Sequence, residues 1–121
     1  MDDRHRKEAG SAGERAALAY LQNAGLKLVH RNFRCRSGEI DLVMLDGSTL
    51  ALIEVRYRSS SRFGGAAASV TWRKQRRLVN AAEHLLLRRA DLRRHPARFD
   101  VIAIGPDEIE WIKGAFLADS G

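Results

Sequence analysis

Two apolar runs flank one turn in the segment GEIDLVMLDGSTLALIEVRY, residues 38–57. Residues 39–45 alternate in the manner of a β-strand, and residues 49–57 predict a second strand. Asp46-Gly47 lies between them and is typical of a tight hairpin turn. The segment therefore predicts two antiparallel strands joined by a short loop.

The chain on either side of this hairpin predicts a mixed α/β domain. A capping-box spacing from Ser11 to Glu14 begins a helix that Gly25 can close, and residues 26–34 predict a strand before the hairpin. After the hairpin we expect a loop with Gly64-Gly65 at its middle and, in order, a helix over 69–89 and strands over 99–104 and 109–112. A helical crossover makes the third and fourth strands parallel. The expected domain spans residues 11–117, with tails at 1–10, taken as disordered, and at 118–121.

Composition and charge limit the classes of protein that this chain can be. Its 121 residues suit one domain, and its single cysteine, Cys35, excludes an internal disulfide. No run of 18 apolar residues and no apolar leader occurs, so we expect a cytoplasmic protein without a membrane partner. The net charge is +6, but residues 56–98 alone carry +10 and the rest carries −4. This asymmetry favours the binding of a polyanion on one side of the molecule and of a divalent cation on the other.

The register of the hairpin decides whether its acidic residues meet. Glu54 and Arg56 are two residues apart and share one face of their strand. A loop of two residues (46–47) would set Asp41 opposite Leu52, and a loop of four (46–49) would set it opposite Glu54. In both registers Asp41 lies on the face of Glu54, whereas a loop of three or five residues would separate them.

Paired carboxylates on neighbouring strands repel each other, and a hard cation such as Mg²⁺ relieves that repulsion. Such a cation also stabilises the charge that develops when a phosphodiester is hydrolysed. Ion pairs between these acids and nearby arginines would explain the same residues. The spacing alone does not choose between the two interpretations.

Several short motifs follow one another in a fixed order: Gly38–Asp41, Glu54–Arg56, Phe63-Gly64, Lys74 and Arg98–Val101. In this combination the chain, from about Gly13 to Phe116, resembles the YraN family of small bacterial proteins. That family is similar to the PD-(D/E)XK nucleases, in particular to the Holliday-junction resolvase branch. The resemblance implies a restriction-endonuclease-like core and a Mg²⁺- or Mn²⁺-dependent endonuclease acting on branched or damaged DNA, without a small-molecule cofactor.

The resemblance also implies roles for individual residues. Asp41 and Glu54 would be metal ligands together with the main-chain carbonyl of Val55, and Glu14 would be an acid contributed by the first helix. The superfamily pattern ends in lysine, but this chain has Arg56, which cannot act as a base. Either the reaction needs no protein base, or Lys74 substitutes from the second helix, or catalysis is lost and a nucleic-acid-binding accessory protein remains.

The basic residues predict where a nucleic acid would lie. The candidates for phosphate contacts are Arg58, Arg62, Arg73, Lys74, Arg76 and Arg77. Trp72 could stack on a base, although anchoring of the helix to the sheet explains it better. For Glu39 we expect an ion pair with Arg34 or Arg36, and for Asp100 a structural ion pair. Resolving a junction needs two active sites, so such an activity would require a homodimer. A sugar-binding site such as that of a glycosidase is disfavoured, because only 7% of the residues are aromatic and residues 56–98 are strongly basic.

Overall fold

A computed structural model describes residues 3–57 and 70–118, with side chains from Ala12 onward. It contains two long helices, one short 3₁₀ helix and five strands within the described residues. In chain order they are α1 (Asp3–Asn23), β1 (Lys27–Cys35), β2 (Gly38–Asp46), β3 (Thr49–Tyr57), α3 (Trp72–Arg88), η1 (Ala90–Leu92), β4 (Ala97–Ile104) and β5 (Ile109–Phe116). The predicted loop at 59–68 lies outside the described residues.

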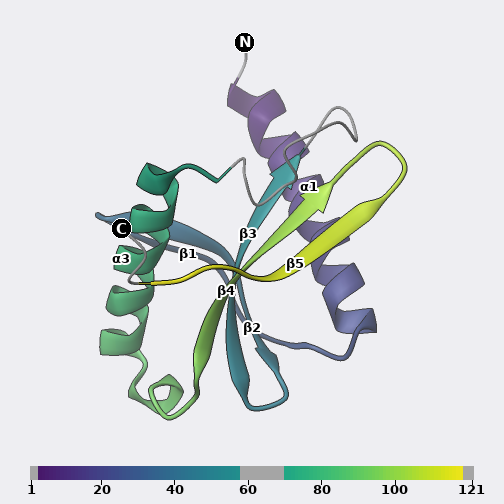
Figure 1. The fold of residues 1–121 in the computed structure, drawn as a ribbon. Helices are drawn as coiled ribbons and strands as arrows, with labels where there is room; N and C mark the ends of the chain where they lie inside the picture. Colours follow the sequence, from purple (N-terminus) through teal and green to yellow (C-terminus); the bar gives the residue numbers. More distant parts are fainter. Residues whose placement is uncertain (1–2, 58–69, 119–121) are drawn as a thin grey trace.

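The five strands form one mixed sheet in the order β1-β2-β3-β4-β5 (Figure 1). All neighbouring strands are antiparallel except β3 and β4, which are parallel. The predicted meander and the parallel return after the second helix are therefore confirmed. The last strand is longer than predicted, since it continues to Phe116.

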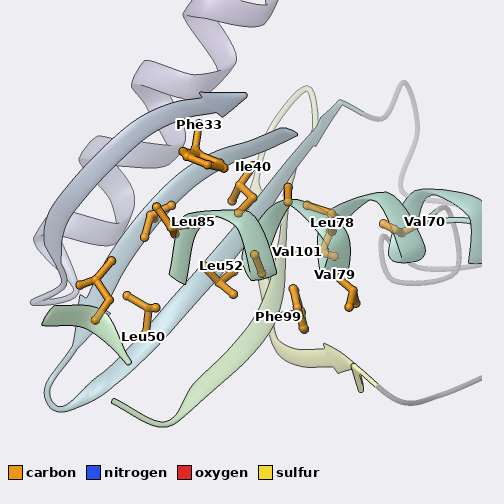
Figure 2. Packing of buried hydrophobic residues seen from close by; sticks show 14 of the residues in the cluster. Phe33, Ile40, Leu50, Leu52, Val70, Leu78, Val79, Leu85, Phe99 and Val101 are labelled. Atoms are coloured by element: carbon orange, nitrogen blue, oxygen red, sulfur yellow. The ribbon is translucent and has the colours of Figure 1, made fainter. Parts of the chain in front are cut away.

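Each long helix covers one face of this sheet, so the sheet separates two apolar layers (Figure 1). The larger layer packs beneath α3, where Leu78 and Leu85 meet Leu52 and Val101 (Figure 2). The smaller layer packs beneath α1, where Ala17 and Leu21 join residues of β2, β3 and β4. The fold is the α+β architecture expected, and it is compatible with a restriction-endonuclease-like core.

The first helix begins at Asp3 instead of Ser11, so residues 3–10, which we expected in a disordered tail, are helical. Arginine, lysine, glutamate and alanine make up most of this segment, and all four favour helices. The Ser11–Glu14 capping-box spacing consequently lies inside the helix. A matching capping pattern is therefore not proof of a helix end.

The second long helix starts at Trp72, where Thr71 caps it by accepting a hydrogen bond from the amide of Lys74 at 3.2 Å. Val70, 2% exposed, anchors this end to the sheet. Trp72 itself is 60% exposed. The expectation that Trp72 anchors the helix was therefore wrong, because Val70, two residues earlier, fills that place in the core.

Gly38 allows the start of β2 to pass directly against α3. A Cβ at this position would overlap the backbone carbonyl of Arg77. Near the same place Ser37 and His84 lie within hydrogen-bonding distance, at 3.4 Å. The β1–β2 turn is thus held to the helix that carries the basic residues.

Replacing Gly38 with Ala should lower the free energy of unfolding by about 3 kcal/mol, because overpacking against a backbone cannot be relieved by a side-chain rotation. Gly47→Ala is the matched control, since its site has open space and only a positive φ of 63°. That control should cost about 1 kcal/mol. Urea denaturation measures both. An equal loss in the two variants would mean that the approach of Gly38 to Arg77 is not tight.

Candidate active site

The hairpin has the register that aligns the two acidic residues. Asp46 pairs with Thr49 and Leu42 pairs with Ile53, which leaves Gly47 and Ser48 as the loop. Continuing this register by one residue sets Asp41 opposite Glu54. Of the two registers left open above, this is the one that would align the carboxylates, although the strand pairing itself ends at Leu42 and Ile53.

Regular strand pairing ends just before this pair, and Asp41 makes a different contact. Its Oδ2 accepts a hydrogen bond of 2.8 Å from the main-chain amide of Val55. At this position a hydrogen bond from the main chain to a side chain takes the place of a main-chain hydrogen bond between the strands. It holds the carboxylate of Asp41 against β3. The side chain of Val55 packs with the α1 layer, so it points away from α3.

The alternation of β2 is interrupted at Asp41. Ile40 (Figure 2) and Val43 both pack in the α3 layer, whereas Leu42 packs in the α1 layer. A regular strand would place Ile40 and Leu42 on the same face. The irregularity lets the carboxylate of Asp41 interact with Glu54 and also with Glu14 on α1.

Burial raises the pKa of Asp41 to about 7. The charge of Glu54 is the next largest cause, and Glu14 and Glu39 add to it, while the hydrogen bond from Val55 acts in the opposite direction. Excess negative charge is therefore concentrated at this point of the sheet. A cation bound here would be favoured for the same reason that protonation is.

Burial also raises the pKa of Glu54, whose side chain is 13% exposed. The ammonium of Lys74 and then the guanidinium of Arg56 oppose this shift. Arg56 Nη1 lies 3.9 Å from Glu54 Oε1, as the i, i+2 spacing on β3 predicts. The charge of Arg77 lowers the pKa as well and that of Glu39 raises it, so Glu54 interacts with three cations and with neighbouring carboxylates.

Glu54 and α3 form a small open pocket of about 50 Å³. The residues that line it are Glu39, Glu54, Lys74, Arg77 and Leu78. A volume of this size accommodates a few water-sized groups, such as a hydrated ion or a phosphate, but not a whole nucleotide. The structure therefore brings Lys74, predicted from its place on the second helix, to the same pocket as Glu54.

Two further residues predicted to contact phosphate, Arg73 and Arg76, lie on α3 but do not line this pocket. Arg73 is exposed on the first turn of α3, and Arg76 donates a hydrogen bond of 3.2 Å from Nη1 to the carbonyl of Ala118. Arg58 and Arg62 lie outside the described residues. Within the described part of the chain no three His, Cys, Asp or Glu side chains gather as metal ligands, so Glu14 does not complete a three-carboxylate site with Asp41 and Glu54.

Two acidic residues considered above have the ion pairs that we expected. Arg34 Nε lies 3.4 Å from Glu39 Oε2, with both side chains exposed. Arg98 Nε donates to Asp100 Oδ1 at 2.9 Å. Glu39 nevertheless also lines the pocket.

Sequence reasoning missed the contact that positions the N-terminal helix. The ring of Tyr57, at the end of β3, lies over Gly13, where an added Cβ would come within 2.5 Å of Tyr57 Oη. Gly13 precedes Glu14, whose charge acts on Asp41, so this contact helps to position the part of α1 that carries this acid. A glycine within a helical pattern was the available signal, because such a residue often marks a close approach.

None of the helices in the described residues is long and apolar enough to cross a membrane.

Comparison with known proteins places the chain beside a large group of bacterial relatives. A family model described as "Uncharacterised protein family UPF0102" matches residues 13–104. A UPF0102 protein of Herminiimonas arsenicoxydans is 56% identical over 111 residues, covering 91% of this chain and 87% of that protein. Another, from Alcanivorax borkumensis, is 46% identical over 121 residues, covering 96% and 97%. A third, from Janthinobacterium sp. (strain Marseille), is 54% identical over 110 residues, covering 91% and 88%.

Proposed function

This chain belongs to the family UPF0102, which is the YraN family, as its motifs predicted, and we propose that it hydrolyses phosphodiester bonds of DNA with a divalent metal ion. The observation that carries the proposal is that half-buried Glu54 shares a pocket with the cations Lys74 and Arg77 of α3 and interacts with half-buried Asp41. Carboxylates supply the oxygen ligands that Mg²⁺ prefers, and cations supply contacts for phosphate.

The donor set fits a hard divalent cation. Asp41 and Glu54 both have pKa values raised by burial, and Asp41 is further affected by the charge of Glu54. Mg²⁺ or Mn²⁺ would be held by these two carboxylates and by the main-chain carbonyl of Val55. When bound, the ion supplies positive charge that stabilises the developing charge on the phosphoryl oxygens.

The residues of the chain would then hold the substrate in place. Lys74 and Arg77 can bind the phosphate at the pocket that Glu54 lines, and Arg56 can bind a further oxygen. In the reaction a water oxygen bonds to phosphorus and the water releases a proton, the bond to the leaving sugar oxygen breaks, and that oxygen takes up a proton. Of these three cations only Lys74 can exchange a proton, because an arginine in a protein remains charged.

Lys74 should therefore matter more than Arg56. We expect Lys74→Ala to slow cleavage about 100-fold, which is the lower end of the range for loss of a proton-transfer group. The loss of rate in Arg56→Ala should be several-fold smaller than the loss in Lys74→Ala. Lys74→Arg keeps the charge without the exchangeable proton, so it should stay as slow as Lys74→Ala. Single-turnover rates at saturating protein measure this difference. Full activity in Lys74→Arg would mean that charge alone is needed.

Arg56 favours a second candidate function, that of a DNA-binding accessory protein without catalysis. It occupies the place of the pattern lysine and pairs with Glu54 at 3.9 Å. Binding without catalysis would persist in the absence of divalent metal and would weaken steeply with salt. Cleavage would instead require Mg²⁺ or Mn²⁺.

The test of the proposed function is a cleavage assay on duplex, single-stranded and four-way-junction DNA. We expect products from at least one substrate with Mg²⁺ or Mn²⁺ and none with a chelator. Glu54→Gln should abolish them without preventing binding. Metal-independent binding with no cleavage of any substrate would establish the second candidate, and cutting that survives Glu54→Gln would indicate a different site or a contaminating nuclease.

A further inference from the structure

Trp72 is an exposed aromatic residue within a basic surface. It is the first residue of α3, and 60% of it is accessible. The core contact at this end of the helix is already made by Val70. Packing of the described core therefore does not account for an indole at this position.

The helical repeat places Trp72 and the pocket on opposite flanks of α3. Residues of an α-helix follow one another at about 100°, so Trp72 and Lys74 leave the helix about 200° apart. Lys74 and Arg77 lie on the flank that lines the pocket. Trp72 lies on the flank of Arg76, which reaches the carbonyl of Ala118 beyond β5.

Cations fill the outer surface between these two flanks. We define the α3 band as Arg73, Lys74, Arg76 and Arg77, with the pocket at one border and Trp72 at the other. A helix is about 10–12 Å wide, and a stacked strand advances about 3.4 Å along its axis for each nucleotide. The band thus corresponds to about three nucleotides of one strand.

We propose that Trp72 stacks on an unpaired base of a nucleic acid whose backbone crosses the α3 band. This inference rests on the proposed function, since the scissile phosphate is the one held at the pocket. The bases of a duplex are already stacked on both faces, so an indole at this place selects a substrate with a single-stranded segment about three nucleotides from that phosphate. A protein partner with an apolar surface would cover Trp72 but would leave the cations of the band without partners.

The test measures binding without divalent metal, so that it does not depend on cleavage. The probes are a dT oligonucleotide and a blunt duplex of the same length. Trp72→Ala should weaken binding of the oligonucleotide about 10- to 100-fold, the range for loss of one base–aromatic stack, and change duplex binding less than 2-fold. Trp72→Phe should bind the oligonucleotide nearly as well as the wild type.

The chain has two tryptophans, which gives an independent optical readout. Trp111 is half-buried and donates to Asp100, so oligonucleotide binding should quench fluorescence in the wild type and not in Trp72→Phe. Leu87→Ala is the matched control, because Leu87 is 70% exposed near the other end of α3.

Three results would overturn the inference. If Trp72→Ala lost equal affinity for the oligonucleotide and the duplex, or lost affinity for neither, the proposed function would stay intact but stacking by Trp72 would be excluded. Loss of self-association in Trp72→Ala, measured by sedimentation with DNA affinity unchanged, would assign Trp72 to an interface between copies. Absence of binding to any DNA by the wild type would refute the proposed function as well.

Discussion

Asp41→Asn should reduce metal-dependent cleavage about 10²–10³-fold, the loss expected when a group that organises transition-state charge is removed. The same substitution should make the protein more stable at pH 8. The amide keeps an oxygen that can accept the hydrogen bond from Val55, made at 2.8 Å in the wild type. It lacks the charge that Glu54, Glu14 and Glu39 disfavour. Activity and stability should therefore change in opposite directions.

The pH dependence follows from the raised pKa of Asp41, which burial moves from 3.8 to about 7. Below about pH 4 the carboxyl is protonated in both the folded and the unfolded chain. As the pH rises from about 4 to about 7, the unfolded chain releases the proton first and the folded state loses stability. Above pH 7 the loss is complete, and we expect it to be at most about 4 kcal/mol.

Urea denaturation of the wild type and Asp41→Asn across this pH range measures the difference. The advantage of the variant should be largest at pH 8 and absent near pH 4. Added Mg²⁺ should stabilise the wild type at pH 8 and the variant much less. Asp107→Asn is the control, since Asp107 is exposed. Destabilisation of Asp41→Asn at pH 8 would contradict the electrostatic account of the site.

Asp100→Ala should have the opposite effect on stability, a loss of about 3–5 kcal/mol. Asp100 is 1% exposed, and its carboxylate accepts hydrogen bonds from Arg98 Nε, Trp111 Nε1 and the amide of Gly114 at 2.9–3.1 Å. Alanine would leave all three donors without this acceptor. Unlike Asp41, this carboxylate is surrounded by donors and has a structural role.

Thermal and urea denaturation of Asp100→Ala test this role, with Asp91→Ala as the control. Asp91 is an exposed carboxylate paired with Arg89 at 2.8 Å, and its removal should have little effect because surface ion pairs contribute little. The folded fraction of Asp100→Ala should retain the cleavage rate of the wild type. A selective loss of catalysis without loss of stability would place Asp100 in the active site.

Several parts of the site were predictable because they depend on neighbours in the sequence. The i, i+2 spacing on β3 correctly placed Arg56 beside Glu54. The turn signal limited the hairpin to a few registers, one of which sets Asp41 opposite Glu54. The turn signal could not reveal the break in side-chain alternation at Asp41, because this break depends on which helix packs on each side of β2.

The sequence by itself determined the order of the strands and helices and the parallel return to β4, and it limited the hairpin to a few registers. These follow from side-chain periodicity and turn chemistry, which act over a few residues. Only the tertiary structure decided that Lys74 shares a pocket with Glu54, that Gly38 lies against Arg77, and that Trp72 stays exposed. The positions of these residues depend on the translation and rotation of α3 relative to the sheet, and the packing of the whole apolar layer sets that placement.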